Sequence, residues 1–152
     1  MITAILNGFK RPHALKEQYE AIKNQTVDDL KFMFWGNYDA DSLDKFPEEV
    51  IRGCTSAMCN QNLGVWARFA YALNADTKYI CVFDDDTIPG RKWLENCLMT
   101  MQSHTGLLGC RGVRMTGDDY MNYPGCQYKA FGAANPSTEV EQVDIMGHCW
   151  FF

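Results

Sequence analysis

Three consecutive aspartates follow directly on a short apolar run in the stretch YICVFDDDTIPG, residues 79 to 90. The run from Tyr79 to Phe83 has the length and composition of a buried strand. Adjacent carboxylates repel one another, so a strand that ends in three of them needs a cation to neutralise them. Residues i and i+2 of an extended chain face the same way, so Asp84 and Asp86 can share one divalent ion while Asp85 points elsewhere. The alternative is a solvated acidic turn that caps the next helix.

Short apolar runs alternate with segments of helical periodicity along most of the chain. We predict helices over residues 13–24, 47–52, 64–75 and 91–102, and strands over residues 2–6, 30–35, 79–83, 107–115 and 140–146. Segment 116–136 reads as irregular. This alternation indicates an α/β fold with a mostly parallel central sheet flanked by helices. Ligands bind beyond the carboxyl ends of such strands, which places at one edge the segments 7–11, 37–41 and 84–86.

The composition narrows the classes of function. With 152 residues, a hydrophobic fraction of 47% and no internal repeat, the chain suits one domain with its own core. The formal net charge of -5 argues against broad electrostatic binding to nucleic acid or to an anionic membrane. No apolar run reaches the length of a signal peptide core or a membrane span, so we expect a cytoplasmic protein. The seven cysteines include no CxxC pair, which favours reduced core thiols over a zinc site.

Four segments, in chain order, resemble the GT-A fold glycosyltransferases of the large family 2 type, and the short viral enzymes with this fold most of all. FDDDTIP resembles the DXD motif of the family. ITAILNGFKRPHALKEQYEAIKNQT is similar to its opening strand and helix, and NQNLGVWARFAYALN to the helix before the DXD strand. VDIMGHCWFF resembles the later strand and glycine-containing turn near the donor sugar. The resemblance covers nearly the whole chain and implies a Rossmann-like GT-A domain.

The resemblance assigns residues of the first two loops to a nucleotide-sugar donor. It implies that Asn7, Gly8 and Arg11 meet the nucleotide base and ribose, although Asn7-Gly8 also fits a tight turn. Asn37 or Asp39 stands where the family usually has an acid that contacts the base. The segment GNYDADS departs from the family's usual pattern, so the choice between these two residues stays open.

The later matching residues are assigned to the diphosphate and a metal ion. Arg68 matches the arginine of the helix before the DXD strand, where it reaches the nucleotide or pairs with an aspartate. The resemblance implies that Asp84 binds the ribose or donor sugar, that Asp85 contacts the sugar or supports the loop, and that Asp86 binds Mn²⁺ or Mg²⁺. Asp84 and His148 complete the predicted metal set, because a neutral imidazole can be a third ligand. A structural role for His148 is the alternative.

The implied reaction moves a sugar from a nucleotide-sugar, a UDP-sugar by default, to a hydroxyl of a glycan or other acceptor, with inversion favoured. The cation offsets charge on the leaving diphosphate. An inverting enzyme also needs a carboxylate base, which in the family follows the last matching motif by some tens of residues. We therefore expect a partial domain, with a nucleotide-binding half at 1–90, the start of an acceptor-side half at 91–152, and the base beyond Phe152. The carboxylates left as candidates are Asp118, Asp119 and Asp144.

Two other functions fit parts of the sequence. VFDDDTI comes within one residue of the nucleophile motif of haloacid-dehalogenase-like phosphatases, in which Asp84 is the nucleophile, and GDDYMN half resembles the later acidic motif of that family. In that family the nucleophile strand is normally the first of the domain, whereas two predicted strands precede Asp84 here. A non-catalytic nucleotide-sugar-binding module is the second alternative.

Overall fold

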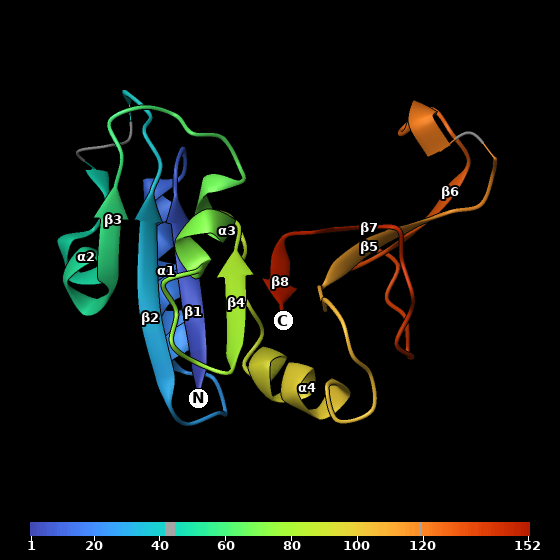
Figure 1. Cartoon of the computed structure of the whole chain (residues 1–152), viewed down its shortest axis with the longest axis horizontal. Helices are drawn as coiled ribbons and strands as arrows, with labels where there is room; N and C mark the ends of the chain where they lie inside the picture. Colours follow the sequence, from blue (N-terminus) through green and yellow to red (C-terminus); the bar gives the residue numbers. More distant parts are fainter. Residues whose placement is uncertain (42–44, 119) are drawn as a thin grey trace.

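The main sheet of the computed structural model, which describes residues 1–41, 45–118 and 120–152, has five strands in the order β3-β2-β1-β4-β8 (Figure 1). Four strands are parallel, and the last is antiparallel to β4. Their bounds are β1 Ile2–Gly8, β2 Leu30–Gly36, β3 Thr55–Met58, β4 Tyr79–Phe83 and β8 Cys149–Phe151. The predicted α/β class with a mostly parallel central sheet is confirmed.

Helices cover both faces of this sheet, and their bounds are α1 Pro12–Lys23, α2 Glu48–Gly53, α3 Ala67–Ala72 and α4 Trp93–Thr100. Leu15 of α1, Val50 of α2 and Leu94 of α4 join one buried cluster with Leu6 of β1. Ala72 of α3 joins a second cluster with Ile5, Met33 and Val82. Because side chains alternate along a strand, β1 feeds both clusters and is buried over its full length. This double cover explains why its sequence is mostly apolar without alternation.

A second, antiparallel sheet has the order β6-β5-β7, with β5 Arg111–Met115, β6 Tyr128–Phe131 and β7 Ile145–Gly147. Figure 1 shows it extending away from the main sheet, with the chain returning through β7 into β8. A short 3-10 helix, Tyr120–Asn122, lies at its far end. Among the described residues, no helix combines the length and apolar character needed to cross a bilayer.

Several predicted boundaries differ from the structure. The break expected at Asn7-Gly8 is absent, because β1 continues through Gly8 and pairs it with Gly36. The helix expected over 64–75 is only α3: the positive φ of +71° at Gly64 is incompatible with a helix there, and the helix ends with Leu73 as its C-cap. The strands expected over 107–115 and 140–146 shorten to β5 and β7. Strands β3, β6 and β8 were not predicted. Strands β3 and β6 are largely exposed and lack a continuous apolar run, and β8 has only three residues.

Candidate functional site

The turn after β4 is held in place by partly buried hydrogen bonds. Gln18, which is fully buried in α1, donates from Nε2 to the carbonyls of Asp84 and Thr87, both at 2.7 Å. The backbone N–H of Asp84 and the hydroxyl of Thr87 both donate to the carbonyl of His148 at 2.9 Å. The turn is therefore held by α1 on one side and by the β7–β8 junction on the other.

The three aspartates of this turn separate as the i, i+2 spacing predicts. Asp84, Asp86 and His148 each offer one ligand atom, and these atoms all lie within 4.8 Å of one another. Asp85 points elsewhere and is only 8% exposed. It accepts hydrogen bonds from the Lys10 backbone N–H at 3.1 Å and from Arg11 Nη1 at 2.8 Å. Asp85 thus supports the loop between β1 and α1, while the other three side chains converge.

His148 reaches this cluster through an unusual backbone conformation. Its φ is +72°, in the left-handed region that a non-glycine residue occupies at a cost. It follows Gly147, where β7 ends and β8 begins. Strain of this kind concentrates at functional sites, and here it is the conformation in which His148 faces the carboxylates.

Three arginines engage the three clustered side chains. Arg68 Nη1 lies 2.5 Å from Asp84 Oδ1, Arg11 Nη1 lies 3.3 Å from Asp86 Oδ2, and Arg111 Nη1 lies 3.0 Å from His148 Nε2. Each arginine comes from a different element, so the site draws on both sheets. Neither Arg111 nor Gln18 was predicted as a functional residue. Gln18 carried a readable signal, as a polar residue between Leu15 and Ile22 on the apolar face of α1.

Arg68 is the most enclosed of these arginines. It is 6% exposed, and its guanidinium lies 4.9 Å from the centroid of the Trp150 ring. Within the described residues its Nε has no hydrogen-bond partner. Trp150 also packs edge-on against Phe69, with ring centroids 5.2 Å apart. Arg68 is thus a buried partner that can orient the Asp84 carboxylate, and Trp150 packs against the Arg68 guanidinium.

The donor set fits a divalent cation. Two carboxylates and one imidazole suit Mn²⁺, and the carboxylate oxygens alone suit Mg²⁺. The excess negative charge of Asp84 and Asp86 is met by arginines in this structure, as an uncompensated acidic pair requires. The geometry therefore agrees with Asp84, Asp86 and His148 as metal ligands, and that role stays a prediction.

The predicted nucleotide-binding residues at the ends of β1 and β2 serve the fold as well. A Cβ on Gly8 would lie 2.6 Å from the Phe34 ring and 2.9 Å from that of Phe46, so only glycine fits there. Asn37 is buried and its Oδ1 accepts from the Leu63 N–H at 3.0 Å. Its Nδ2 donates to Asn62 at 2.9 Å. These contacts join the ends of β1 and β2 to the segment before α3; Asn7 is 9% exposed and Asp39 is half-buried.

Two of the carboxylates considered as a catalytic base, Asp118 and Asp144, lie near the second sheet. Asp144 Oδ2 accepts a hydrogen bond of 2.7 Å from the Met115 backbone N–H, which gives it a structural role. Asp118 is exposed just after β5. Asp119 lies outside the described residues. The catalytic base remains unassigned.

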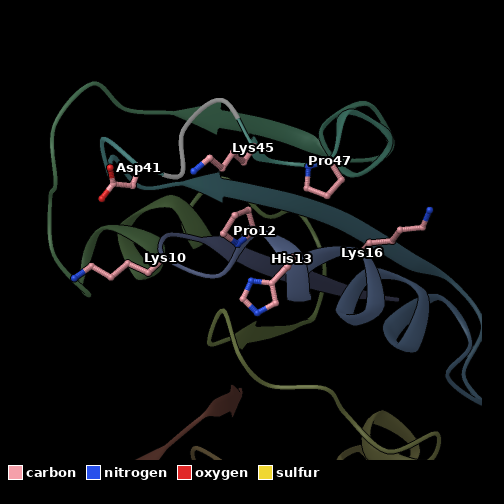
Figure 2. Close-up of a pocket in the computed structure, with 7 residues that line it drawn as sticks. All are labelled: Lys10, Pro12, His13, Lys16, Asp41, Lys45 and Pro47. Atoms are coloured by element: carbon pink, nitrogen blue, oxygen red, sulfur yellow. The ribbon is translucent and has the colours of Figure 1, made fainter.

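A hollow of about 590 Å³ lies beside the N-terminus of α1, between it and the segment before α2 (Figure 2). Its wall is rich in cationic side chains, and it is lined by Lys10, Pro12, His13, Lys16, Asp41, Lys45 and Pro47. Lys16 is also paired with Glu49 at 2.9 Å. Because Lys10 belongs to the loop that Asp85 supports, this hollow adjoins the carboxyl edge of the sheet.

Two thiols lie next to the cluster. The neighbouring Cys149 thiol lowers the pKa of Cys110 to about 7, whereas the pKa of Cys149 is raised by the same contact and by burial. Burial also raises the pKa of Cys97 to about 12 and that of Cys81 well above its ordinary value. Cys110 is exposed, and Cys81, Cys97 and Cys149 are buried. Reduced core thiols were predicted for the seven cysteines. All seven are free in the structure, but only Cys81, Cys97 and Cys149 are buried.

Comparisons with known proteins identify the fold. No protein-family model and no curated protein matches the sequence. The mannosyltransferase PcManGT from Pyrobaculum calidifontis, in complex with GDP-Man and Mn²⁺, aligns with a TM-score of 0.60 and 18% identity over 72% of this chain and 34% of that one. S. aureus TarS 1-349 aligns with a TM-score of 0.56 and 13% identity, and its UDP-GlcNAc complex has the same values. TarS is matched over 81% of this chain and 38% or 36% of its own.

This chain therefore spans well under half the length of the structures it matches. The shared architecture is the α/β arrangement of GT-A glycosyltransferases, with a mostly parallel central sheet flanked by helices. The predicted GT-A fold is confirmed. The phosphatase alternative expects the nucleophile strand first in the domain, whereas in the structure three strands precede β4, the strand that leads to Asp84.

Proposed function

We propose that this chain binds a nucleotide-sugar and a divalent cation at the carboxyl edge of its main sheet and serves glycosyl transfer to an acceptor hydroxyl. One observation carries the proposal: Asp84, Asp86 and His148 converge within 4.8 Å at that edge. Parallel α/β sheets bind ligands at this edge, and the fold neighbours include a mannosyltransferase in complex with GDP-Man and Mn²⁺.

In this proposal the residues of the chain divide into ligands and supports. Asp84, Asp86 and His148 hold Mn²⁺ or Mg²⁺, which when bound supplies positive charge to the leaving diphosphate. Arg68 orients Asp84 through their 2.5 Å ion pair, and Gln18 holds the backbone of the same turn. Asp85 keeps the β1–α1 loop in position through Lys10 and Arg11.

The remaining donor contacts are proposed from the sequence. Asn7, Gly8, Arg11, Asn37 and Asp39 lie at the ends of β1 and β2 or in the loops that follow, on the edge expected to bind the nucleotide. A UDP-sugar donor and transfer with inversion follow the family resemblance, as do a glycan or similar hydroxyl acceptor and a cytoplasmic location. Inverting transfer also requires a base that accepts the proton of the acceptor hydroxyl. The alternative function, for a chain without such a base, is to bind the nucleotide-sugar and the metal without transferring the sugar.

The proposal is tested by calorimetric titration of the chain with UDP and with GDP, each in the presence and absence of Mn²⁺. We expect nucleotide binding that depends on Mn²⁺ and that is lost in Asp86→Asn. Asp76→Asn is the matched control, because Asp76 is an exposed carboxylate that pairs with Lys31 at 2.7 Å. Nucleotide binding that is equal with and without the metal would contradict the proposal. Release of sugar from UDP-glucose or GDP-mannose then separates a transferase from a binding module.

A further inference from the structure

The bond between Arg111 and His148 has a consequence for metal binding. A guanidinium only donates hydrogen bonds, so His148 Nε2 accepts the bond from Arg111 Nη1 at 3.0 Å. A neutral imidazole has one nitrogen lone pair available, and its other nitrogen then carries the proton. Because that single lone pair is occupied, neither nitrogen of His148 can coordinate a cation while this bond exists. Metal coordination by His148 and its bond to Arg111 exclude one another.

Arg111 is held less firmly than the other two arginines of the cluster. Arg68 is 6% exposed beneath Trp150, and Arg11 is held by Asp85 as well as by Asp86. Arg111 is exposed at the first position of β5. Over residues 1–41, 45–118 and 120–152, its guanidinium makes one side-chain hydrogen bond, the one to His148. Release of Arg111 therefore breaks a single exposed contact.

A released Arg111 leaves a positive charge beside the cation site. The guanidinium and a cation at this site are both positive and repel one another, which weakens metal binding unless an anion lies between the two. A diphosphate is such an anion, and the planar guanidinium binds phosphate oxygens with two parallel hydrogen bonds. The same side chain thus opposes the metal in the free protein and favours the metal together with a diphosphate.

We propose that Arg111 couples the two ligands of the site: it occupies His148 in the free protein and transfers to the diphosphate of the nucleotide when the cation binds. This inference rests on the proposed function, because it takes the donor to be a nucleoside diphosphate derivative. It assigns Arg111 as a positioning residue for His148 and as a contact for the diphosphate. Cation and nucleotide then bind cooperatively, and each raises the affinity of the other by the same factor.

The test measures Mn²⁺ affinity from the electron paramagnetic resonance signal of free Mn²⁺, with and without saturating UDP or GDP. In the unaltered protein we expect the nucleotide to raise Mn²⁺ affinity by about tenfold or more, within the range typical of coupled sites. In Arg111→Met, Mn²⁺ binds the free protein about three- to tenfold more tightly, because the competing donor and its charge are gone. The nucleotide then raises Mn²⁺ affinity only slightly.

Arg114→Met is the matched control. Arg114 lies on the same strand and pairs with Glu141 at 2.6 Å, so its loss removes an ion pair of the second sheet without touching His148. We expect its Mn²⁺ affinity and its coupling to match those of the unaltered protein. In a His148→Ala background, Arg111→Met tightens Mn²⁺ binding less than it does with His148 present, because only the charge of Arg111 and not its competition for the imidazole is then removed.

The outcomes separate the inference from the proposed function. If the unaltered protein binds Mn²⁺ and nucleotide but Arg111→Met leaves both the free-protein affinity and the coupling unchanged, the role of Arg111 is overturned and the proposed function stands. If Arg114→Met changes the coupling as much as Arg111→Met does, a general charge effect replaces the specific one. If neither ligand binds, both proposals fail.

Discussion

The two sheets of the molecule are stabilised in different ways. Every residue of β1 is buried, and helices cover both faces of the main sheet. In the second sheet only Gly112, Val113 and Phe131 are buried among the strand residues. The proposed cation site lies between these regions: Asp84 and Asp86 follow a strand of the main sheet, whereas Arg111 and His148 come from the second sheet and its connection to β8. The proposed site thus combines residues from a well-buried sheet with residues from a sheet that is mostly exposed.

The largest expected effect distinguishes the cores of the two sheets. Phe34→Ala removes a fully buried ring from β2, and we expect a loss of about 3–5 kcal/mol in the free energy of unfolding. Phe131→Ala in β6 removes a ring of the same size from a strand whose other residues are not buried, and we expect about half that loss. Urea denaturation of both variants measures the difference. Equal losses would mean that the two sheets form one cooperative core.

The next effect separates stability from the geometry of the site. Gln18→Met leaves the carbonyls of Asp84 and Thr87 without their buried donor, so we expect a loss of about 2 kcal/mol and weaker Mn²⁺ binding. Gln25→Met is the control, because buried Gln25 donates to the carbonyls of Ala21 and Gly90 instead. It should cost similar stability and leave Mn²⁺ affinity unchanged. Thermal unfolding and metal titration check both; parallel losses of metal affinity would remove the special role of Gln18.

A smaller effect with the opposite sign is expected at the junction of the two sheets. His148 has a φ of +72°, which glycine adopts without strain. His148→Gly should therefore be more stable than His148→Ala by about 1 kcal/mol, while both lose the imidazole and bind Mn²⁺ equally weakly. Thermal unfolding ranks the pair. Equal stability would show that the left-handed conformation is not retained.

The smallest effect is chemical and compares thiols of the two regions. Cys110, just before β5, has a pKa of about 7, so its thiolate forms as the pH rises through neutrality. We expect its alkylation by iodoacetamide to be half-maximal near pH 7 and to level off above it. Cys81 and Cys97 in the main core have raised pKa values and stay unmodified in the folded protein. Mass spectrometry of the labelled peptides checks the order, and uniform labelling would contradict it.

The sequence predicted the main sheet better than the second one for a physical reason. Strands buried on both faces read as continuous apolar runs, as in residues 79–83, and their carboxyl ends meet at one edge. That reasoning led to the convergence of Asp84 and Asp86, and the family resemblance added His148. The second sheet is half-exposed, so residues 128–131 carry no clear periodicity. Arg111 was not predicted, because no feature of the neighbouring sequence distinguishes it from other exposed arginines. Its partner His148 lies 37 residues further along the chain and comes close only because the chain returns into β8.

The short bridge between Leu108 and Phe151 has a consequence for how this molecule can change over evolution. The two residues exchange backbone hydrogen bonds of 2.8 Å, so the segment after α4 is joined to β8, and the second sheet lies between these two points of the chain. A segment anchored in this way at both ends can vary in length and sequence at little cost to the core of the main sheet. Residues 112–146 can thus vary in length and sequence, while Arg111 and His148, next to this bridge, keep their places at the candidate site.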